Sequence, residues 1–132
     1  MNNPNPSSSS HHNNPHPQVL SLAFLGDAVI TFYIRSYLVN EPEEKLGVLH
    51  KRASTYENAG NQARVFDRLE LTQDEADLAN RAHNAKVNTK AKNATLSDYR
   101  KATALEALVG YWHTKGEQQK VSAVVLQLMS LV

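Results

Sequence analysis

Two apolar segments, each interrupted by a single carboxylate, constrain the fold of this chain most strongly. Asp27 interrupts segment 23–30, and Glu106 interrupts segment 104–110. From residue 19 to 39, apolar side chains recur at the i, i+3, i+4 and i+7 positions of a helix and extend around nearly its whole circumference. Such a helix belongs in a core or at an interface, where an unpaired carboxylate costs several kcal/mol. Asp27 and Glu106 are therefore candidates for a shared cation site.

The rest of the sequence predicts further helices and no strand of useful length. A capping box of Thr72 and Glu75 opens one helix, which carries Arg81 in its last turn, and Gly116 closes another. The fold class is all-α with about six helices, expected at 19–39, 45–56, 58–69, from Thr72 to about Arg81, 96–115 and 117–131.

The domain organisation is simple. Residues 1–17 are almost entirely Asn, Pro, Ser and His, so we expect a disordered low-complexity tail followed by one domain at 18–132. The absence of cysteine excludes disulfides and thiolate metal ligands. No uninterrupted apolar stretch approaches the roughly 20 residues of a membrane span, so no membrane partner is expected.

Charge is distributed unevenly although the net charge is only +1. Five acids lie between residues 67 and 77, whereas six basic residues and one acid lie between 81 and 101. The segment 81–93 mixes cations with amides and contains no aromatic residue, which favours contact with phosphate and sugar groups, as in duplex RNA, over base stacking. A solvated loop with scattered lysines is the alternative. The candidate RNA-binding residues are Arg81, Asn84, Lys86, Lys90, Lys92, Tyr99 and Arg100.

The chemistry available to the chain is that of carboxylates. If the helices of Asp27 and Glu106 pack together, the two acids can bind a hard cation such as Mg²⁺, which takes oxygen ligands and retains several waters. The alternative is that each acid lies on a helix surface or in a structural salt bridge, because sequence spacing does not show convergence. The histidines at 50, 83 and 113 have no partner at i+3 or i+4 for a metal pair, and neither a serine nucleophile motif nor a glycine-rich phosphate loop is present.

The segments around both acids are similar to a known family. Residues 22–29 resemble the signature helix of ribonuclease III catalytic domains, and residues 104–111 resemble the second catalytic helix of that domain. Between them, residues 81–86, 92–94 and 99–100 resemble the compact subgroup called mini-ribonuclease III. The resemblance extends from about Gln18 to the C-terminus.

The resemblance implies a homodimeric, all-α endoribonuclease that cleaves double-stranded RNA with Mg²⁺, for which Mn²⁺ can substitute, and leaves 5′-phosphate products. It assigns Asp27 and Glu106 as metal-binding catalytic acids and places Lys86, Lys90, Lys92, Tyr99 and Arg100 in the RNA-contact region. Apolar faces near Phe24, Leu25 and Phe32 are the expected dimer interface. The implied substrate is precursor 23S ribosomal RNA, and the implied location is the bacterial cytoplasm, or a plastid if the source is a plant.

The chain departs from larger ribonucleases III at two positions. Ala23 and Thr103 stand where those enzymes carry further acids. The resemblance implies that the mini subgroup also lacks these two acids, and their absence leaves the number of metals per site open. A non-catalytic RNA-binding protein on the same scaffold is the alternative function, and a helical metal-dependent phosphohydrolase of nucleotides is a third.

Overall fold

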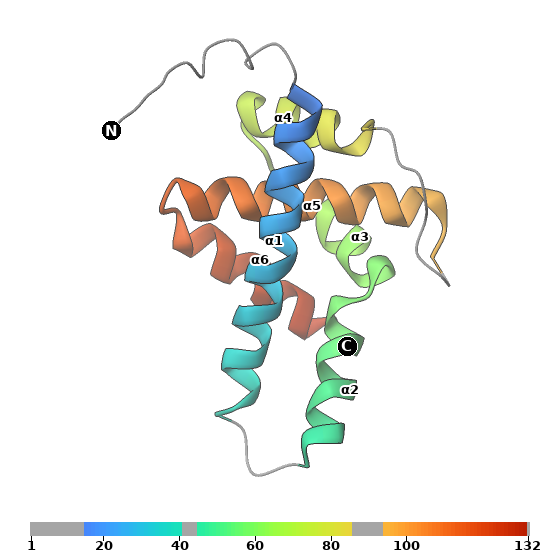
Figure 1. Cartoon of the computed structure of the whole chain (residues 1–132), viewed down its shortest axis with the longest axis vertical. Coiled ribbons are helices and arrows are strands. Elements are labelled where there is room, and N and C mark those ends of the chain that lie inside the picture. Colours follow the sequence, from blue (N-terminus) through green and yellow to red (C-terminus); the bar gives the residue numbers. More distant parts are fainter. Residues whose placement is uncertain (1–14, 41–44, 86–93, 132) are drawn as a thin grey trace.

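The computed structural model describes residues 15–40, 45–85 and 94–131, with side chains from Gln18 onward, and within these ranges the chain forms six helices and no strand (Figure 1). The all-α fold class is therefore confirmed. Each helix boundary lies within a few residues of its expected place, although the first helix already begins inside the expected tail. Most of that tail and most of the expected 85–94 loop fall outside the described residues. The helices are α1 (Pro15–Leu38), α2 (Leu46–Glu57), α3 (Ala59–Asp67), α4 (Gln73–His83), α5 (Leu96–Thr114) and α6 (Gln118–Ser130).

Local capping chemistry sets several of these boundaries. The Thr72 hydroxyl accepts the backbone N–H of Glu75 at 3.2 Å, and the Glu75 carboxylate accepts the N–H of Thr72 at 3.0 Å, which completes the capping box of α4. Thr95 caps α5 by accepting the N–H of Asp98 at 3.0 Å. Gly116, just after α5, has a φ of 76°, the left-handed conformation that ends helices. These ends are coded locally, which is why the sequence locates them.

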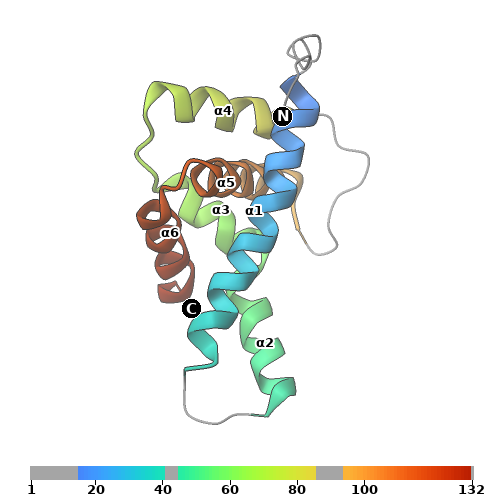
Figure 2. The ribbon, with the colours of Figure 1, turned by 60° about the vertical axis from the view of Figure 1, so that its left-hand side comes forward.

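Helix α5 is the centre of the molecule. Helices α1, α3, α4 and α6 are arranged around it, as two views of the ribbon show (Figures 1 and 2). Ala104, Leu105 and Leu108 of α5 are fully buried by these neighbours. An acid on α5 therefore meets protein on most sides, and its partners come from several elements.

Two glycines bring the backbones of α1 and α5 into contact where they cross. A Cβ atom added to Gly26 would lie 1.7 Å from the Glu106 carbonyl oxygen, and one added to Gly110 would lie 2.1 Å from the Leu22 carbonyl oxygen. Any side chain at either position would force the helices apart. The glycines thereby place Asp27, the next residue of α1, beside the Glu106 turn of α5.

The break between α2 and α3 is anchored to α6 by a fully buried amide. The Asn61 side chain donates to the backbone oxygens of Tyr56 at 2.9 Å and of Leu128 at 3.0 Å. A buried amide with both N–H groups bonded fixes local geometry, since any shift would leave a polar group unpaired. This anchor holds the last turn of α2 and the first turn of α3 in place against α6.

One face of α1 has no covering element among the described residues. The side chains of Phe24 and Phe32 are 83% and 67% exposed on this face. Between Gln18 and Leu38 the helix is also long and apolar enough, by length and composition alone, to cross a membrane, contrary to the sequence expectation. The opposite face of the same helix packs on α5 and carries core residues such as Ile30 and Ile34, so a core helix with an unpaired outer face accounts for that composition.

Candidate functional site

The crossing of α1 and α5 brings together the two acids singled out from the sequence. Asp27 and Glu106 share a side-chain hydrogen bond, although they are 79 positions apart. The apolar sequence around each acid predicts that both are buried. The structure agrees only for Glu106, which is partly buried, whereas Asp27 is exposed. Asp27 lies at the edge of the uncovered face of α1, which is why an apolar sequence context did not mean burial.

The surroundings of Glu106 favour its neutral form. Burial, the negative charge of Asp27 and the hydrogen bond with it together raise the pKa of Glu106 to about 8, although a hydrogen bond from Gln62 opposes the shift. Among the described residues, the main groups that shift this pKa are the carboxylates of Asp27 and Glu57 and the amide of Gln62. At neutral pH these surroundings therefore favour a proton on Glu106.

Two residues from the α2–α3 junction complete the surroundings of this pair. The Glu57 charge also raises the pKa of Glu106, and its carboxylate accepts a hydrogen bond from the Thr31 hydroxyl at 2.6 Å. Gln62 donates to the Glu57 backbone oxygen at 2.9 Å, while its Oε1 is buried without a hydrogen-bond partner among the described residues. Sequence reasoning missed both residues, because they lie at a helix junction that looks solvated and no local pattern connects them to α5.

The oxygen atoms at the crossing suit a hard dication. Carboxylate and amide oxygens are the ligands that Mg²⁺ prefers, and the orphaned Gln62 oxygen is an acceptor still lacking a donor. Within the described ranges, no three His, Asp or Glu side chains lie close enough to form a ligand set by themselves. Asp27 and Glu106 would therefore hold an ion that keeps several waters, which is the usual mode for Mg²⁺.

The two positions at which larger ribonucleases III carry further acids are occupied by buried residues. Ala23 packs in the core, and the Thr103 hydroxyl donates to the Tyr99 carbonyl of its own helix at 2.9 Å. Neither side chain can bind a cation here, so the site rests on fewer acids than in the larger enzymes.

Four of the seven candidate RNA-binding residues fall in the described part of the chain. Arg81 and Asn84 are exposed at the end of α4, where the Asn84 oxygen lies 3.1 Å from His83 Nδ1. Tyr99 and Arg100 lie partly buried in the first turns of α5, and Arg100 Nε is buried with no hydrogen-bond partner among the described residues. The other three candidates lie outside the described residues: Lys86, Lys90 and Lys92.

One member of the basic stretch is neutralised. Lys101 Nζ lies 2.9 Å from Asp67 Oδ1, so a cation of the basic segment pairs with an acid of the acidic one. The charge asymmetry of the sequence is therefore partly cancelled in space, and the remaining cations define the surface.

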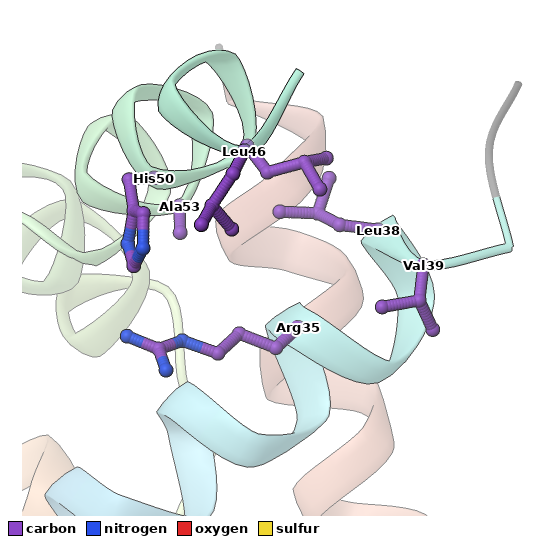
Figure 3. Close-up of a pocket in the computed structure, with 7 residues that line it drawn as sticks. Arg35, Leu38, Val39, Leu46, His50 and Ala53 are labelled. Atoms are coloured by element: carbon purple, nitrogen blue, oxygen red, sulfur yellow. The ribbon is translucent and has the colours of Figure 1, made fainter. Parts of the chain in front are cut away.

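A separate cleft of about 190 Å³ lies between the C-terminal end of α1 and α2 (Figure 3). Arg35, Leu38 and Val39, at the end of α1, line one side of it, and Leu46 and His50 of α2 line the other. None of the described residues that line this cleft carries a carboxylate, so among them it lacks the groups that bind a hard dication. The α1–α5 crossing remains the candidate site.

Known proteins with similar sequences and structures show the family to which the chain belongs. Residues 20–117 match the Ribonuclease III domain. The chain is 34% identical to Mini-ribonuclease 3 of Staphylococcus aureus, over 86% of this chain and 87% of that protein, and 40% identical to Mini-ribonuclease 3 of Brevibacillus brevis, over 86% of each. A protein of Fusobacterium nucleatum with a crystal structure matches the fold with a TM-score of 0.78 at 26% identity, covering 85% of this chain and 91% of that one.

This all-α domain, with an acidic pair at its central helix crossing, is the domain of an RNA endonuclease. The chain belongs to the ribonuclease III family. Within that family its bacterial relatives place it in the mini-ribonuclease III group, as the sequence motifs predicted.

Proposed function

We propose that this protein is a Mg²⁺-dependent endoribonuclease that cleaves double-stranded RNA, with Asp27 and Glu106 as its catalytic, metal-binding acids. The observation that carries the proposal is the pairing of these acids at the glycine-lined crossing of α1 and α5. Mn²⁺ would occupy the same oxygen ligands.

The protein's own groups prepare the site in three ways. Asp27 presents a solvent-exposed carboxylate, whereas Glu106 holds a proton that a cation must displace. Gln62 fixes Glu106 by its hydrogen bond. A bound dication supplies Lewis-acid stabilisation to a phosphoryl oxygen and lowers the pKa of water. Hydrolysis in line would leave a 5′-phosphate and a 3′-hydroxyl.

The RNA would be held by groups near the ends of α4 and α5. Arg81 and Asn84 are free to meet phosphate and sugar oxygens from the exposed end of α4. Arg100 contributes a guanidinium whose buried Nε lacks a partner among the described residues, and Tyr99 lies beside it. Lys86, Lys90 and Lys92 would extend this basic surface through the segment that joins the two helices.

We propose a homodimer in which the uncovered face of α1 forms the interface. Phe24 and Phe32 expose most of their rings on this face, and Leu25 is partly buried beside them. Exposed aromatic side chains on one apolar helix face are typical of an interface core. Two copies would then supply two acidic sites, one for each strand of a duplex.

The cellular role is proposed from the group to which the chain belongs. Its relatives are bacterial proteins named Mini-ribonuclease 3, and maturation of 23S ribosomal RNA in the cytoplasm is the role we propose. If the source is a plant, the corresponding place is the plastid.

Incubation of the full chain with a long RNA duplex, with and without Mg²⁺, tests the proposal. Wild type should cut the duplex only with the ion, and Asp27→Asn should leave it intact while still binding it. Binding that Mg²⁺ does not alter, with no cleavage product, would instead support the non-catalytic RNA-binding alternative, which the missing acids at Ala23 and Thr103 favour.

A further inference from the structure

A buried amide oxygen beside the acidic pair has no partner. Gln62 is only 4% exposed, and its amide N–H groups donate to the Glu57 backbone oxygen at 2.9 Å and to Glu106. These bonds fix the orientation of the amide, because a flipped amide would place two oxygens against each other. Its Oε1 is left buried with no hydrogen-bond donor among the described residues. A buried acceptor without a donor is destabilising, so this oxygen is available to a donor that arrives with a ligand.

The Glu57 carboxylate lies next to the same place. Thr31 follows Asp27 by four residues on α1, so the two side chains are neighbours on one helix face. The Thr31 hydroxyl donates to Glu57 Oε1 at 2.6 Å, which holds that carboxylate about one helical turn from Asp27. Glu57 also adds to the negative charge felt by Glu106. Helices α1, α2, α3 and α5 thus converge on one acidic, oxygen-rich region.

We propose that Glu57 and Gln62 are the outer part of the cation site, where they position the ion by accepting hydrogen bonds from the waters that it retains. This inference rests on the proposed metal dependence of the enzyme. Both are positioning residues, since no three acids lie close enough to share an ion directly within the described part of the chain.

The proposal explains how a site with few acids can hold a hard dication. Ala23 and Thr103 supply no ligand, so most of the coordination positions fall to water. Waters bound to a cation donate hydrogen bonds to the groups around them. The Glu57 carboxylate and the Gln62 amide oxygen, on two further helices, can accept those hydrogen bonds. Such outer partners orient the ligands and commonly contribute 10- to 100-fold to metal affinity.

The affinity of the full chain for Mn²⁺ tests the proposed role of Glu57 and Gln62 independently of RNA cleavage. Electron paramagnetic resonance of the free ion measures how much Mn²⁺ is bound. Glu57→Gln keeps an oxygen that can accept the Thr31 hydroxyl but removes the charge, and it should weaken Mn²⁺ binding about tenfold. Gln62→Met should weaken it as well. Glu70→Gln, at an exposed acid before α4, is the matched control and should bind as wild type does. Far-ultraviolet circular dichroism checks that each variant is folded.

Three patterns of outcome are informative. Loss of binding in Asp27→Asn together with weakened binding in Glu57→Gln supports the proposal. Wild-type affinity in Glu57→Gln and in a folded Gln62→Met would overturn it, while Mn²⁺ binding that still depends on Asp27 would leave the proposed function intact. If wild type binds no Mn²⁺ yet cuts duplex RNA without added ion, the metal dependence and this inference both fail. Thr31→Val is a second variant that frees Glu57 without disturbing the buried amide, and a smaller loss of affinity is expected for it.

Discussion

Two glutamates of this protein, the buried Glu75 on α4 and the partly buried Glu106 on α5, have opposite environments. Glu75 accepts hydrogen bonds from the Trp112 indole at 2.9 Å, from Lys120 Nζ at 2.7 Å and from the Thr72 backbone N–H at 3.0 Å. Burial alone would raise the pKa of Glu75, but these donors and the Lys120 charge outweigh it and lower the pKa to about 2. Glu106 has acids around it instead, and burial with those charges raises its pKa to about 8.

The difference separates a structural acid from a functional one. The Glu75 carboxylate is ionised, has its hydrogen-bond donors, and links α4 to α5 and α6. The hydrogen bonds of Lys120 to Glu75 and Glu117 in turn raise the pKa of Lys120. Glu106 has hydrogen bonds with Gln62 and Asp27, but the charges of Asp27 and Glu57 disfavour its ionised form, and this is the property expected of a group that binds a cation. Burial of a carboxylate is therefore uninformative until its partners are known.

The largest expected effect separates the two residues by activity. Glu106→Gln should reduce Mg²⁺-dependent cleavage of duplex RNA by about 10³-fold, which corresponds to about 4 kcal/mol of transition-state stabilisation. Glu75→Gln, assayed at a temperature at which it is folded, should cleave within a few-fold of wild type, because it lies away from the α1–α5 crossing. Single-turnover rates measure both. Equal losses in the two folded variants would abolish the distinction.

For the free energy of unfolding we expect the reverse order, with a larger loss from substitution of Glu75 than from substitution of Glu106. Glu75→Gln removes the charge that pairs with Lys120 and weakens the indole contact, and we expect it to cost about 3 kcal/mol in the free energy of unfolding. Urea titration followed by circular dichroism near pH 7 measures the change. Glu117→Gln is the matched control, since it removes a more exposed carboxylate that also lies near Lys120, at 3.1 Å, and should change stability by less than about 1 kcal/mol.

The sequence predicts the local features around Glu75 and Glu106 but not their contacts with residues distant in the chain. The capping box of Thr72 and Glu75 is visible as a local pattern, and so is the lone acid of each apolar helix. The bonds from Trp112 and Lys120 to Glu75 join residues 37 and 45 positions apart, and they depend on how α5 and α6 dock against α4. The same limit hid Glu57 and Gln62, whose role depends on the α2–α3 junction meeting α5. Asp27 was expected to be buried because neighbouring residues are apolar, but the outer face of α1 is left uncovered.

The pH dependence of stability should distinguish the two acids in the metal-free protein. Folding raises the pKa of Glu106 from an ordinary value of 4.5 to about 8, so the folded state binds the extra proton between these pH values and stability falls as pH rises through them. Glu106→Gln should remove this fall and be more stable than wild type at pH 8, by on the order of 2 kcal/mol. Urea titrations with a chelator from pH 5 to pH 8 measure it. A constant difference across this range would contradict the assignment of the proton to Glu106.

Glu75 should act in a different pH window and in the opposite direction. Its pKa is lowered from 4.5 to about 2, so its contribution is fully present above pH 4.5 and is lost as pH falls toward 2. The stability difference between wild type and Glu75→Gln should be constant from pH 5 to pH 8 and should narrow below pH 4.5. A difference that persists undiminished at pH 2 would mean that packing, not ionisation, accounts for the role of Glu75.

The smallest expected effect concerns a single neutral donor to Glu75. Trp112→Phe keeps an aromatic ring in the core but removes the indole N–H, leaving Lys120 and the Thr72 N–H as donors. The loss should be about 2 kcal/mol, from one hydrogen bond to a charged acceptor and some lost packing. In the Glu75→Gln background the same substitution should cost less, because the indole then donates to a neutral amide. Urea titration of the two single variants and the double variant gives this coupling directly. Additive losses would show that the indole stabilises the core by packing alone, and Glu75 would then owe its ionised state to Lys120 and the helix cap.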